Sequence, residues 1–330
     1  MNSELSEQIL FEVKKVIVGQ DHLLERVLVA LLAEGHLLVE GVPGLAKTLT
    51  VKTLARVLSC DFKRVQFTPD LMPSDLVGTR IYNQKSGEFS TWKGPVFTNL
   101  LLADEINRSP AKVQSALLEV MEERQVSMGG ETHAVPRPFL VMATQNPIET
   151  EGTYPLPEAQ IDRFMMKVLV DYPSSLEEFS IVERVIGRPA DLRPLVDAAQ
   201  LQALGREVAS VYVDPAVIEY AVRLVNATRS PSAFGLNEIA PYLTYGASPR
   251  ASIHLVMTAR ALALLRGRDY VLPSDVRELA PDVMRHRLVL SYEALADRVS
   301  ADDLLRKVFA AVAAPELKID EHHQRTTARA

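Results

Sequence analysis

The stretch that most constrains this sequence is residues 36–48, which read His-Leu-Leu-Val-Glu-Gly-Val-Pro-Gly-Leu-Ala-Lys-Thr. The apolar run between His36 and Glu40 is typical of a short buried strand, and the residues from Lys47 onward favour a helix. A glycine-containing loop between a strand and a helix is the setting of a phosphate-binding loop, because backbone N–H groups and the helix N-terminus converge there on one anion. The sequence therefore predicts such a loop at residues 41–48.

The predicted loop comprises Gly41, Val42, Pro43, Gly44, Leu45, Ala46, Lys47 and Thr48, and Leu49 follows it. Lys47 is expected to reach the β- and γ-phosphates of a nucleotide, and the Thr48 hydroxyl is expected to ligate Mg²⁺. The strict pattern has a second glycine where Ala46 stands. Alanine tolerates helical dihedral angles, which would place Ala46 already in the helix. The alternative is an ordinary strand-to-helix turn, which leaves the Lys-Thr pair after two loop glycines unexplained.

The composition limits the classes of protein to which the chain can belong. Its 330 residues predict two domains, and a hydrophobic content of 47% is ample for a globular core. The 42 acidic residues exceed the 36 basic ones, which argues against a dedicated nucleic-acid binder but leaves room for a local basic groove. Cys60 is the only cysteine, so no disulfide can form within the chain, as suits a reducing compartment. The polar start, Met1 to Glu7, is unlike a signal peptide, and no apolar run reaches membrane-spanning length, so we expect a cytoplasmic protein.

Strand and helix patterns alternate as far as about residue 170, which predicts a parallel α/β domain flanked by helices. The expected strands are 36–40, 64–68, 99–104, 139–144 and 164–170. Beyond Asp171 the pattern is helical, with helices expected at 197–209, 214–229, 248–266 and 273–281. We therefore expect a nucleotide-binding core at 1–186, a hinge at 187–194, a helical lid at 195–315 and a disordered tail at 316–330.

Two segments interrupt the α/β pattern. Residues 70–94 carry prolines and glycines between short β-like pieces, which predicts an inserted loop or hairpin. Residues 125–138 contain a Gly-Gly pair between two strand-like pieces, which predicts a second hairpin. Long ordered insertions of the first kind are often functional.

An apolar strand ends in Asp104 and Glu105. Ligands bind at the carboxyl ends of the strands of a parallel sheet, so both side chains are expected near the phosphate-binding loop. Asp104 is suited to holding Mg²⁺ through water, and Glu105 is suited to polarising an attacking water. Solvated loop carboxylates are a common alternative for an isolated Asp-Glu pair, but the order of elements after Lys47 favours a catalytic site.

A further polar side chain, Asn146, follows the apolar strand at 139–144. Its amide both donates and accepts hydrogen bonds, so it can orient a water or contact the γ-phosphate of a nucleotide. A plain Asn-Pro turn is the alternative. Because we expect this strand to lie beside the strands that end at Glu40 and Asp104, the functional interpretation is favoured.

With these features the sequence resembles the MoxR family of AAA+ ATPases over about residues 18–290. The matching stretches are Val-Gly-Gln at 18–20, Gly-Val-Pro-Gly-Leu-Ala-Lys-Thr at 41–48, Leu-Leu-Ala-Asp-Glu-Ile-Asn-Arg at 101–108, Ala-Thr-Gln-Asn-Pro-Ile-Glu at 143–149, Glu-Gly-Thr-Tyr-Pro-Leu-Pro-Glu-Ala-Gln-Ile-Asp-Arg-Phe at 151–164 and Gly-Ala-Ser-Pro-Arg-Ala at 246–251. The phosphate loop of that family also carries alanine at the position of Ala46.

The resemblance implies a role for each candidate residue. Lys47 and Thr48 would form the Walker A pair, Asp104 and Glu105 the Walker B pair, Asn146 sensor 1, Arg250 sensor 2 and Arg163 the arginine finger, while Val18 and Gly19 would line the adenine pocket. The resemblance also implies a five-stranded parallel sheet of order 5-1-4-3-2, an all-α C-terminal lid, a helix-2 insertion at 70–94 and a hairpin before sensor 1 at 125–138. Arginines are otherwise usually solvated, and Arg108 is a further candidate for a contact across a subunit interface.

The function that the resemblance implies is that of an ATP-hydrolysing, ring-forming factor that remodels protein complexes. MoxR-like proteins are chaperone-like, use ATP and Mg²⁺, and are often paired with partners carrying von Willebrand factor A domains in complex maturation or metal insertion. The implied assembly is a homo-oligomer, expected as a hexameric ring. A helicase-like nucleic-acid motor is one alternative, which the mixed charges of 79–93 and 125–138 do not favour. A nucleotide-gated binding module without turnover is the other, and the intact Asp104, Glu105 and Arg163 argue against it.

Overall fold

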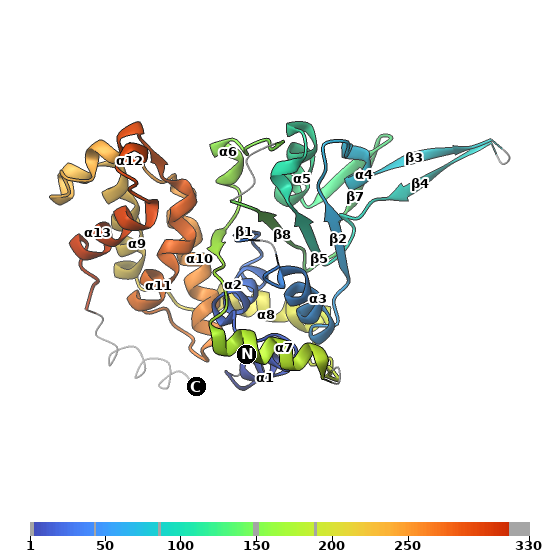
Figure 1. The fold of residues 1–330 in the computed structure, drawn as a ribbon, viewed down its shortest axis with the longest axis horizontal. Coiled ribbons are helices and arrows are strands. Elements are labelled where there is room, and N and C mark those ends of the chain that lie inside the picture. The colour runs from blue at the N-terminus through green and yellow to red at the C-terminus, as the bar shows by residue number, and fades with distance from the viewer. Residues whose placement is uncertain (1–2, 43, 85–86, 148–151, 188–189, 317–330) are drawn as a thin grey trace. The chain divides into compact units, whose positions relative to one another are not determined.

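In the computed structural model the described residues are 3–42, 44–84, 87–147, 152–187 and 190–316 (Figure 1). Their contacts divide the chain into two compact units. The first comprises Met1–Val211 and Arg260–Asp269, and the second comprises Tyr212–Ala259 and Tyr270–Ala330. No helix in the described ranges is long and apolar enough to cross a membrane.

A parallel five-stranded sheet forms the centre of the first unit. Its strands lie in the order β2 (Phe62–Gln66), β5 (Leu100–Asp104), β8 (Leu140–Gln145), β1 (Leu37–Glu40) and β9 (Met166–Leu169). Counted along the chain, this is the order 5-1-4-3-2, and the prediction is confirmed. Strands β5, β8 and β1 are buried on both faces along their apolar sequences, whereas β2 is an edge strand whose residues are exposed or only partly buried.

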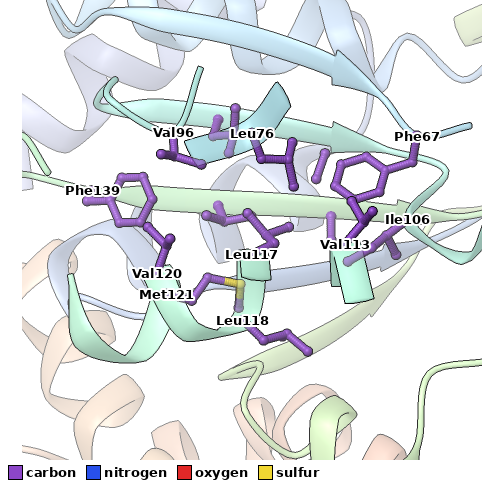
Figure 2. Packing of buried hydrophobic residues seen from close by; sticks show 14 of the residues in the cluster. Phe67, Leu76, Val96, Ile106, Val113, Leu117, Leu118, Val120, Met121 and Phe139 are labelled. Atoms are coloured by element: carbon purple, nitrogen blue, oxygen red, sulfur yellow. The ribbon is translucent and has the colours of Figure 1, made fainter. Parts of the chain in front are cut away.

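Helices pack against this sheet, and α5 (Ala111–Glu123) covers the cluster of buried side chains in Figure 2. Val113, Leu117 and Val120 follow the helical spacing of one amphipathic face, so all three are buried. They belong to the same cluster as Phe67 and Phe139, which flank β2 and β8. The unit also contains α1 (Ser3–Lys14), α2 (Asp21–Leu32), α3 (Lys47–Val57), α4 (Pro73–Val77), α6 (Glu158–Ile161), α7 (Ser175–Ile186) and α8 (Ala198–Ser210).

Both insertions are antiparallel hairpins. The first pairs β3 (Gly78–Asn83) with β4 (Glu88–Lys93) and extends away from the sheet in Figure 1. The second pairs β6 (Gln125–Met128) with β7 (Glu131–Ala134), and the two glycines between them form the turn. Their φ angles of 58° and 87° are positive, which a two-residue hairpin turn requires and which glycine adopts without strain.

The boundary between the two units differs from the expected hinge at 187–194. Helix α8, which the sequence assigns to the lid, lies in the first unit and packs against α2. Just before it, the Leu195 N–H donates a 2.8 Å hydrogen bond to the Val57 carbonyl at the end of α3. The segment that follows the expected hinge is therefore attached to the sheet domain.

The second unit is helical. It contains α9 (Pro215–Arg229), the greater part of α10 (Pro249–Leu265), α11 (Pro273–Met284), α12 (Tyr292–Ala296) and α13 (Ala301–Ala311). A short antiparallel pairing of β10 (Leu243–Tyr245) with β11 (Val289–Leu290) adds to the expected helices. The parallel sheet and this helical unit confirm the predicted fold class. Residues 317–330 of the expected tail, and 188–189 of the expected hinge, lie outside the described residues.

A buried histidine, His36, joins three elements of the first unit. Its Nδ1 accepts a 3.0 Å hydrogen bond from the Val141 N–H on β8, so Nε2 carries the proton and donates to the Met121 carbonyl on α5 at 3.0 Å. Burial lowers the pKa of His36 to about 4; the hydrogen bond to Met121 opposes this shift, and the nearby charge of Arg124 adds to it. The folded protein therefore holds the neutral imidazole.

We expect the free energy of unfolding to fall as the pH is lowered from 6.5 to about 4, because the unfolded chain binds a proton at His36 that the folded protein excludes. The loss from this group is at most about 3 kcal/mol. Denaturant unfolding at a series of pH values measures it, with His36→Gln as the comparison. The wild type should lose more stability than the variant over this range, and parallel curves would contradict the assignment.

Candidate functional site

Three strands of the sheet end in the polar segments that the sequence singles out. Strand β1 leads into the loop at 41–46, β5 ends at Asp104 with Glu105 behind it, and β8 is followed by Asn146. Because β8 pairs in parallel with both β1 and β5, these three segments meet at one edge of the sheet. The expectation that the strand before Asn146 lies beside the other two is confirmed.

The loop at 41–46 passes close to β9 and is held by the N-terminal segment. A Cβ on Gly41 would stand 2.6 Å from the Val170 carbonyl oxygen, so only glycine fits there. Gln20 Nε2 donates a 2.6 Å hydrogen bond to the Leu45 carbonyl, and Lys47 Nζ donates to the Gly41 carbonyl. Apart from Gly44 itself and its two chain neighbours, no described residue has an atom within 4 Å of where a Cβ on Gly44 would stand, so the loop is open there. Pro43 lies outside the described residues.

Ala46 is not part of the helix, and the expectation that it would be is wrong. It is the N-cap of α3, which begins at Lys47, and its φ of 53° lies in the left-handed region. The chain needs this conformation to turn from the loop into the helix, and glycine would adopt it freely. An alanine costs about 1–2 kcal/mol there, so the loop is strained at this position.

The ammonium group of Lys47 is partly desolvated. Burial lowers the pKa of Lys47, and the carboxylates of Asp104, Glu105 and Glu40 act in the opposite direction. A phosphate beside the ammonium would compensate the lost hydration in the same way as these carboxylates do. The lysine is therefore placed to interact with an anion near the ends of β1 and β5.

Both carboxylate oxygens of Asp104 accept hydrogen bonds from neighbouring strands. Oδ1 accepts from the Thr144 hydroxyl on β8 at 2.6 Å. Oδ2 accepts from Arg64 on β2 twice, from Nε at 3.0 Å and from Nη2 at 2.7 Å. Side chains from β8 and β2, the two strands beside β5, thus fix the orientation of this carboxylate.

Glu105 is held in an unusual backbone conformation. Its φ is 56°, and its N–H donates a 2.9 Å hydrogen bond to the Thr144 hydroxyl oxygen. Its Oε2 accepts from Gln66 Nε2 at 2.7 Å and forms an ion pair with Arg108 Nε at 3.3 Å. A non-glycine residue in the left-handed region that several neighbours hold in place is typical of functional sites.

Sequence reasoning did not find Arg64, Gln66 or Thr144. A signal for the first two is present, because alternate residues of a strand point to one face and Arg64 and Gln66 are two apart on β2. Only the pairing of Gln66 with Asp104 in the parallel register brings them to the carboxylates, and that register is a property of the folded sheet.

A cavity of about 1120 Å³ opens beside the loop in the first unit. Its walls come from three segments, within residues 15–23, 44–56 and 169–192, and include Val18, Gly19, Gly44, Leu45, Ala46 and Leu49. Gly19 has a φ of 66°, and a Cβ there would meet Glu177 Oε1 of α7 at 2.5 Å. The cavity is large enough for a nucleotide, and its position next to the loop suits one whose phosphates lie on the loop.

The described residues hold no cluster of three or more His, Cys, Asp or Glu side chains that could bind a metal ion by themselves. Thr48, in the first turn of α3, and Asp104 instead supply one hydroxyl and one carboxylate. Mg²⁺ typically binds to one or two protein oxygens together with substrate phosphates and water. This donor set therefore fits Mg²⁺ that arrives with a phosphate.

Two predicted arginines belong to elements other than the strands that end at the site. Arg163, after α6, forms a 3.3 Å ion pair with Glu122 of α5 in the same chain. Arg250 is in the first turn of α10, in the second unit, and its role as sensor 2 stays a prediction.

The fold and the loop are those of a AAA-type nucleotide-binding domain. Residues 36–166 match the family described as "ATPase family associated with various cellular activities (AAA)", and residues 237–308 match the "AAA lid domain". The "Chaperone MoxR1" of Mycobacterium tuberculosis is 56% identical over 311 residues, which cover 94% of this chain and 82% of that protein. A "Protein MoxR" of Methylorubrum extorquens is 31% identical over 325 residues, covering 92% of this chain and 93% of that protein.

A solved structure agrees over nearly the whole chain. The crystal structure of a "putative ATPase" from Cytophaga hutchinsonii is 47% identical, superposes with a TM-score of 0.90 and covers 95% of this chain and 96% of its own. The chain belongs to the MoxR family of AAA+ ATPases, and nucleotide binding is the property that this family implies for the site.

We expect Thr144→Val to lower the free energy of unfolding by about 1–2 kcal/mol, because it leaves the partly buried Glu105 N–H without its acceptor and Asp104 Oδ1 without its donor. Denaturant unfolding measures the change. Thr50→Val is the matched control. It also removes a hydroxyl hydrogen bond, to the Ala46 carbonyl, but that carbonyl keeps the 2.9 Å hydrogen bond from the Thr50 N–H and is not left without a donor. Equal losses in the two variants would contradict a bridging role for Thr144.

Proposed function

We propose that this chain hydrolyses ATP and acts as a ring-forming, chaperone-like remodelling factor for protein complexes. The observation that carries the proposal is the meeting of Lys47, Asp104 and Glu105 at one edge of the sheet, next to the open loop and the cavity. A cation for the phosphates, a carboxylate for a metal and a second carboxylate for water are what phosphoryl transfer to water needs.

Each residue then has a distinct part in the reaction. Lys47 contacts the β- and γ-phosphates, and the loop N–H groups hold the remaining phosphate oxygens. Thr48 and Asp104 would hold Mg²⁺, which would neutralise charge on the phosphate oxygens. Glu105 accepts a proton from the attacking water, and the Asn146 amide orients that water or the γ-phosphate. Val18 and Gly19 lie on the cavity wall where the adenine would bind.

The ring is proposed because AAA+ proteins assemble into oligomers and because Arg163 belongs to the candidate catalytic set. In this chain Arg163 is paired with Glu122, but the two side chains are 34% and 43% exposed. Exposed ion pairs contribute only about 0–1 kcal/mol to stability. The guanidinium can therefore leave Glu122 at low cost and bind a phosphate of the nucleotide in the adjacent subunit's site. A hexamer is the assembly that the resemblance favours.

The remodelling role is supported by the relatives, one of which is called a chaperone. We infer a protein client rather than a nucleic acid, with a von Willebrand factor A domain protein as the partner that the resemblance suggests. The hairpin β3–β4 offers such a client exposed apolar side chains, among them Tyr82, Phe89 and Trp92, which are 52%, 59% and 50% exposed. Delivery of a metal to a client is one form of maturation that this role includes.

We expect Glu105→Gln to bind ATP as tightly as the wild type and to release phosphate at least about 100-fold more slowly, because the variant keeps the shape of the side chain and loses the base. Lys47→Ala should instead lose tight ATP binding, since it removes a charge-assisted contact. Calorimetry and a phosphate-release assay separate the two. Turnover within a few-fold of the wild type in Glu105→Gln would show that the water is activated elsewhere.

The shared site predicts complementation between two inactive variants. Arg163→Ala should bind nucleotide nearly normally and lose most hydrolysis, since arginine fingers contribute about 10³–10⁵ in rate. Mixing it with Glu105→Gln creates junctions that contain both an intact Glu105 and an intact Arg163. Phosphate release should then recover in part and depend on protein concentration. Full activity of a strictly monomeric preparation, or no recovery from variants shown to co-assemble, would contradict the proposal.

A further inference from the structure

The edge strand β2 places a positive charge on the carboxylate that is proposed to hold the metal. Arg64 donates two hydrogen bonds to Asp104 Oδ2, from Nε at 3.0 Å and from Nη2 at 2.7 Å. The other oxygen of Asp104 accepts from Thr144 at 2.6 Å. A carboxylate offers about four lone-pair sites, so these donors occupy most of its capacity.

We propose that the Arg64 guanidinium competes with Mg²⁺ for the carboxylate of Asp104. The guanidinium binds Asp104 in the nucleotide-free protein and leaves it when a metal–nucleotide complex binds. The inference rests on the proposed function, because it presumes that Asp104 receives a metal. It assigns to Arg64 the part of a positioning residue that sets how much Mg²⁺ the protein needs.

The competition follows from charge and distance. A guanidinium 2.7 Å from Oδ2 repels a divalent cation that approaches the same carboxylate, and it blocks water molecules of the metal from donating to that oxygen. The neutral hydroxyl of Thr144 causes no such repulsion and can stay in place. Of the two partners of Asp104, Arg64 is therefore the one that the metal displaces, because only Arg64 carries a positive charge.

Arg64 also has the freedom to move. Its side chain is 47% exposed, whereas that of Asp104 is 18% exposed. A half-exposed guanidinium that leaves its partner is rehydrated by water, so the exchange costs far less than it would in a dry interior. Fixed charges that are fully buried would not be exchangeable in this way.

The same guanidinium is linked to the second carboxylate. Arg64 Nη2 donates to Gln66 Oε1 at 2.7 Å, and Gln66 Nε2 donates to Glu105 Oε2 at 2.7 Å. The bond from Arg64 fixes the orientation of the Gln66 amide and so keeps its NH₂ group on Glu105.

The test is the Mg²⁺ dependence of binding of a fluorescent ADP analogue, which needs no turnover. In Arg64→Met the Mg²⁺ concentration at half-maximal enhancement of binding should fall about three- to tenfold, as expected for losing a charge-assisted but half-exposed competitor. Binding without Mg²⁺ should not change. Arg64→Lys keeps the charge and loses the planar fork, so it should lie between the wild type and Arg64→Met.

Lys63→Met is the matched control. Lys63 is the preceding exposed residue of β2, and its side chain points to the opposite face of the sheet, so its removal changes the net charge equally without touching Asp104. An unchanged Mg²⁺ midpoint in Arg64→Met, or an equal fall in Lys63→Met, would overturn the inference. Weaker Mg²⁺-free binding with an unchanged midpoint would also overturn it and make Arg64 a phosphate contact. Failure of the wild type to bind the analogue at all would instead contradict the proposed function.

Discussion

The position of β8 between β1 and β5 is the constraint on which the candidate site depends. Its parallel hydrogen bonds to both neighbours bring three strand ends together, one leading into the phosphate loop, one into Asp104 and Glu105, and one into Asn146. Thr144, the second-to-last residue of β8, then bridges Asp104 at the end of β5 and Glu105 directly after it, because its hydroxyl donates to the Asp104 carboxylate and accepts from the Glu105 N–H. A shift of β8 by one residue would turn that hydroxyl to the other face and separate the groups.

Much of this arrangement can be predicted from the sequence because it follows from local patterns. The apolar runs before Glu40, Asp104 and Asn146 define three of the strands, and the glycines near them define the loop and the second hairpin. The family resemblance adds the strand order, which the pattern alone leaves open. The confirmed fold class depends on these short-range features, whereas the placement of the predicted loop beside the carboxylates also depends on the strand order.

What could not be predicted depends on geometry between distant residues. The left-handed conformation of Ala46 is imposed by the turn from loop to helix, against the usual preference of alanine. Arg64 and Gln66 are unremarkable residues of an edge strand until the register with β5 places them on Asp104 and Glu105. Likewise, α8 joins the sheet domain through its packing on α2, which no boundary signal in the sequence marks.

We propose that a nucleotide binds with its phosphates on the loop and its base in the cavity beside it. Photolabelling with an 8-azido analogue of ATP, followed by peptide mapping, tests this most directly because it locates the base without requiring turnover. We expect label on peptides from residues 15–23 or 169–192, which contribute to the cavity walls, and loss of this label when unlabelled ATP is in excess. Label confined to other parts of the chain, or label that excess ATP does not reduce, would show that the base does not bind in this cavity.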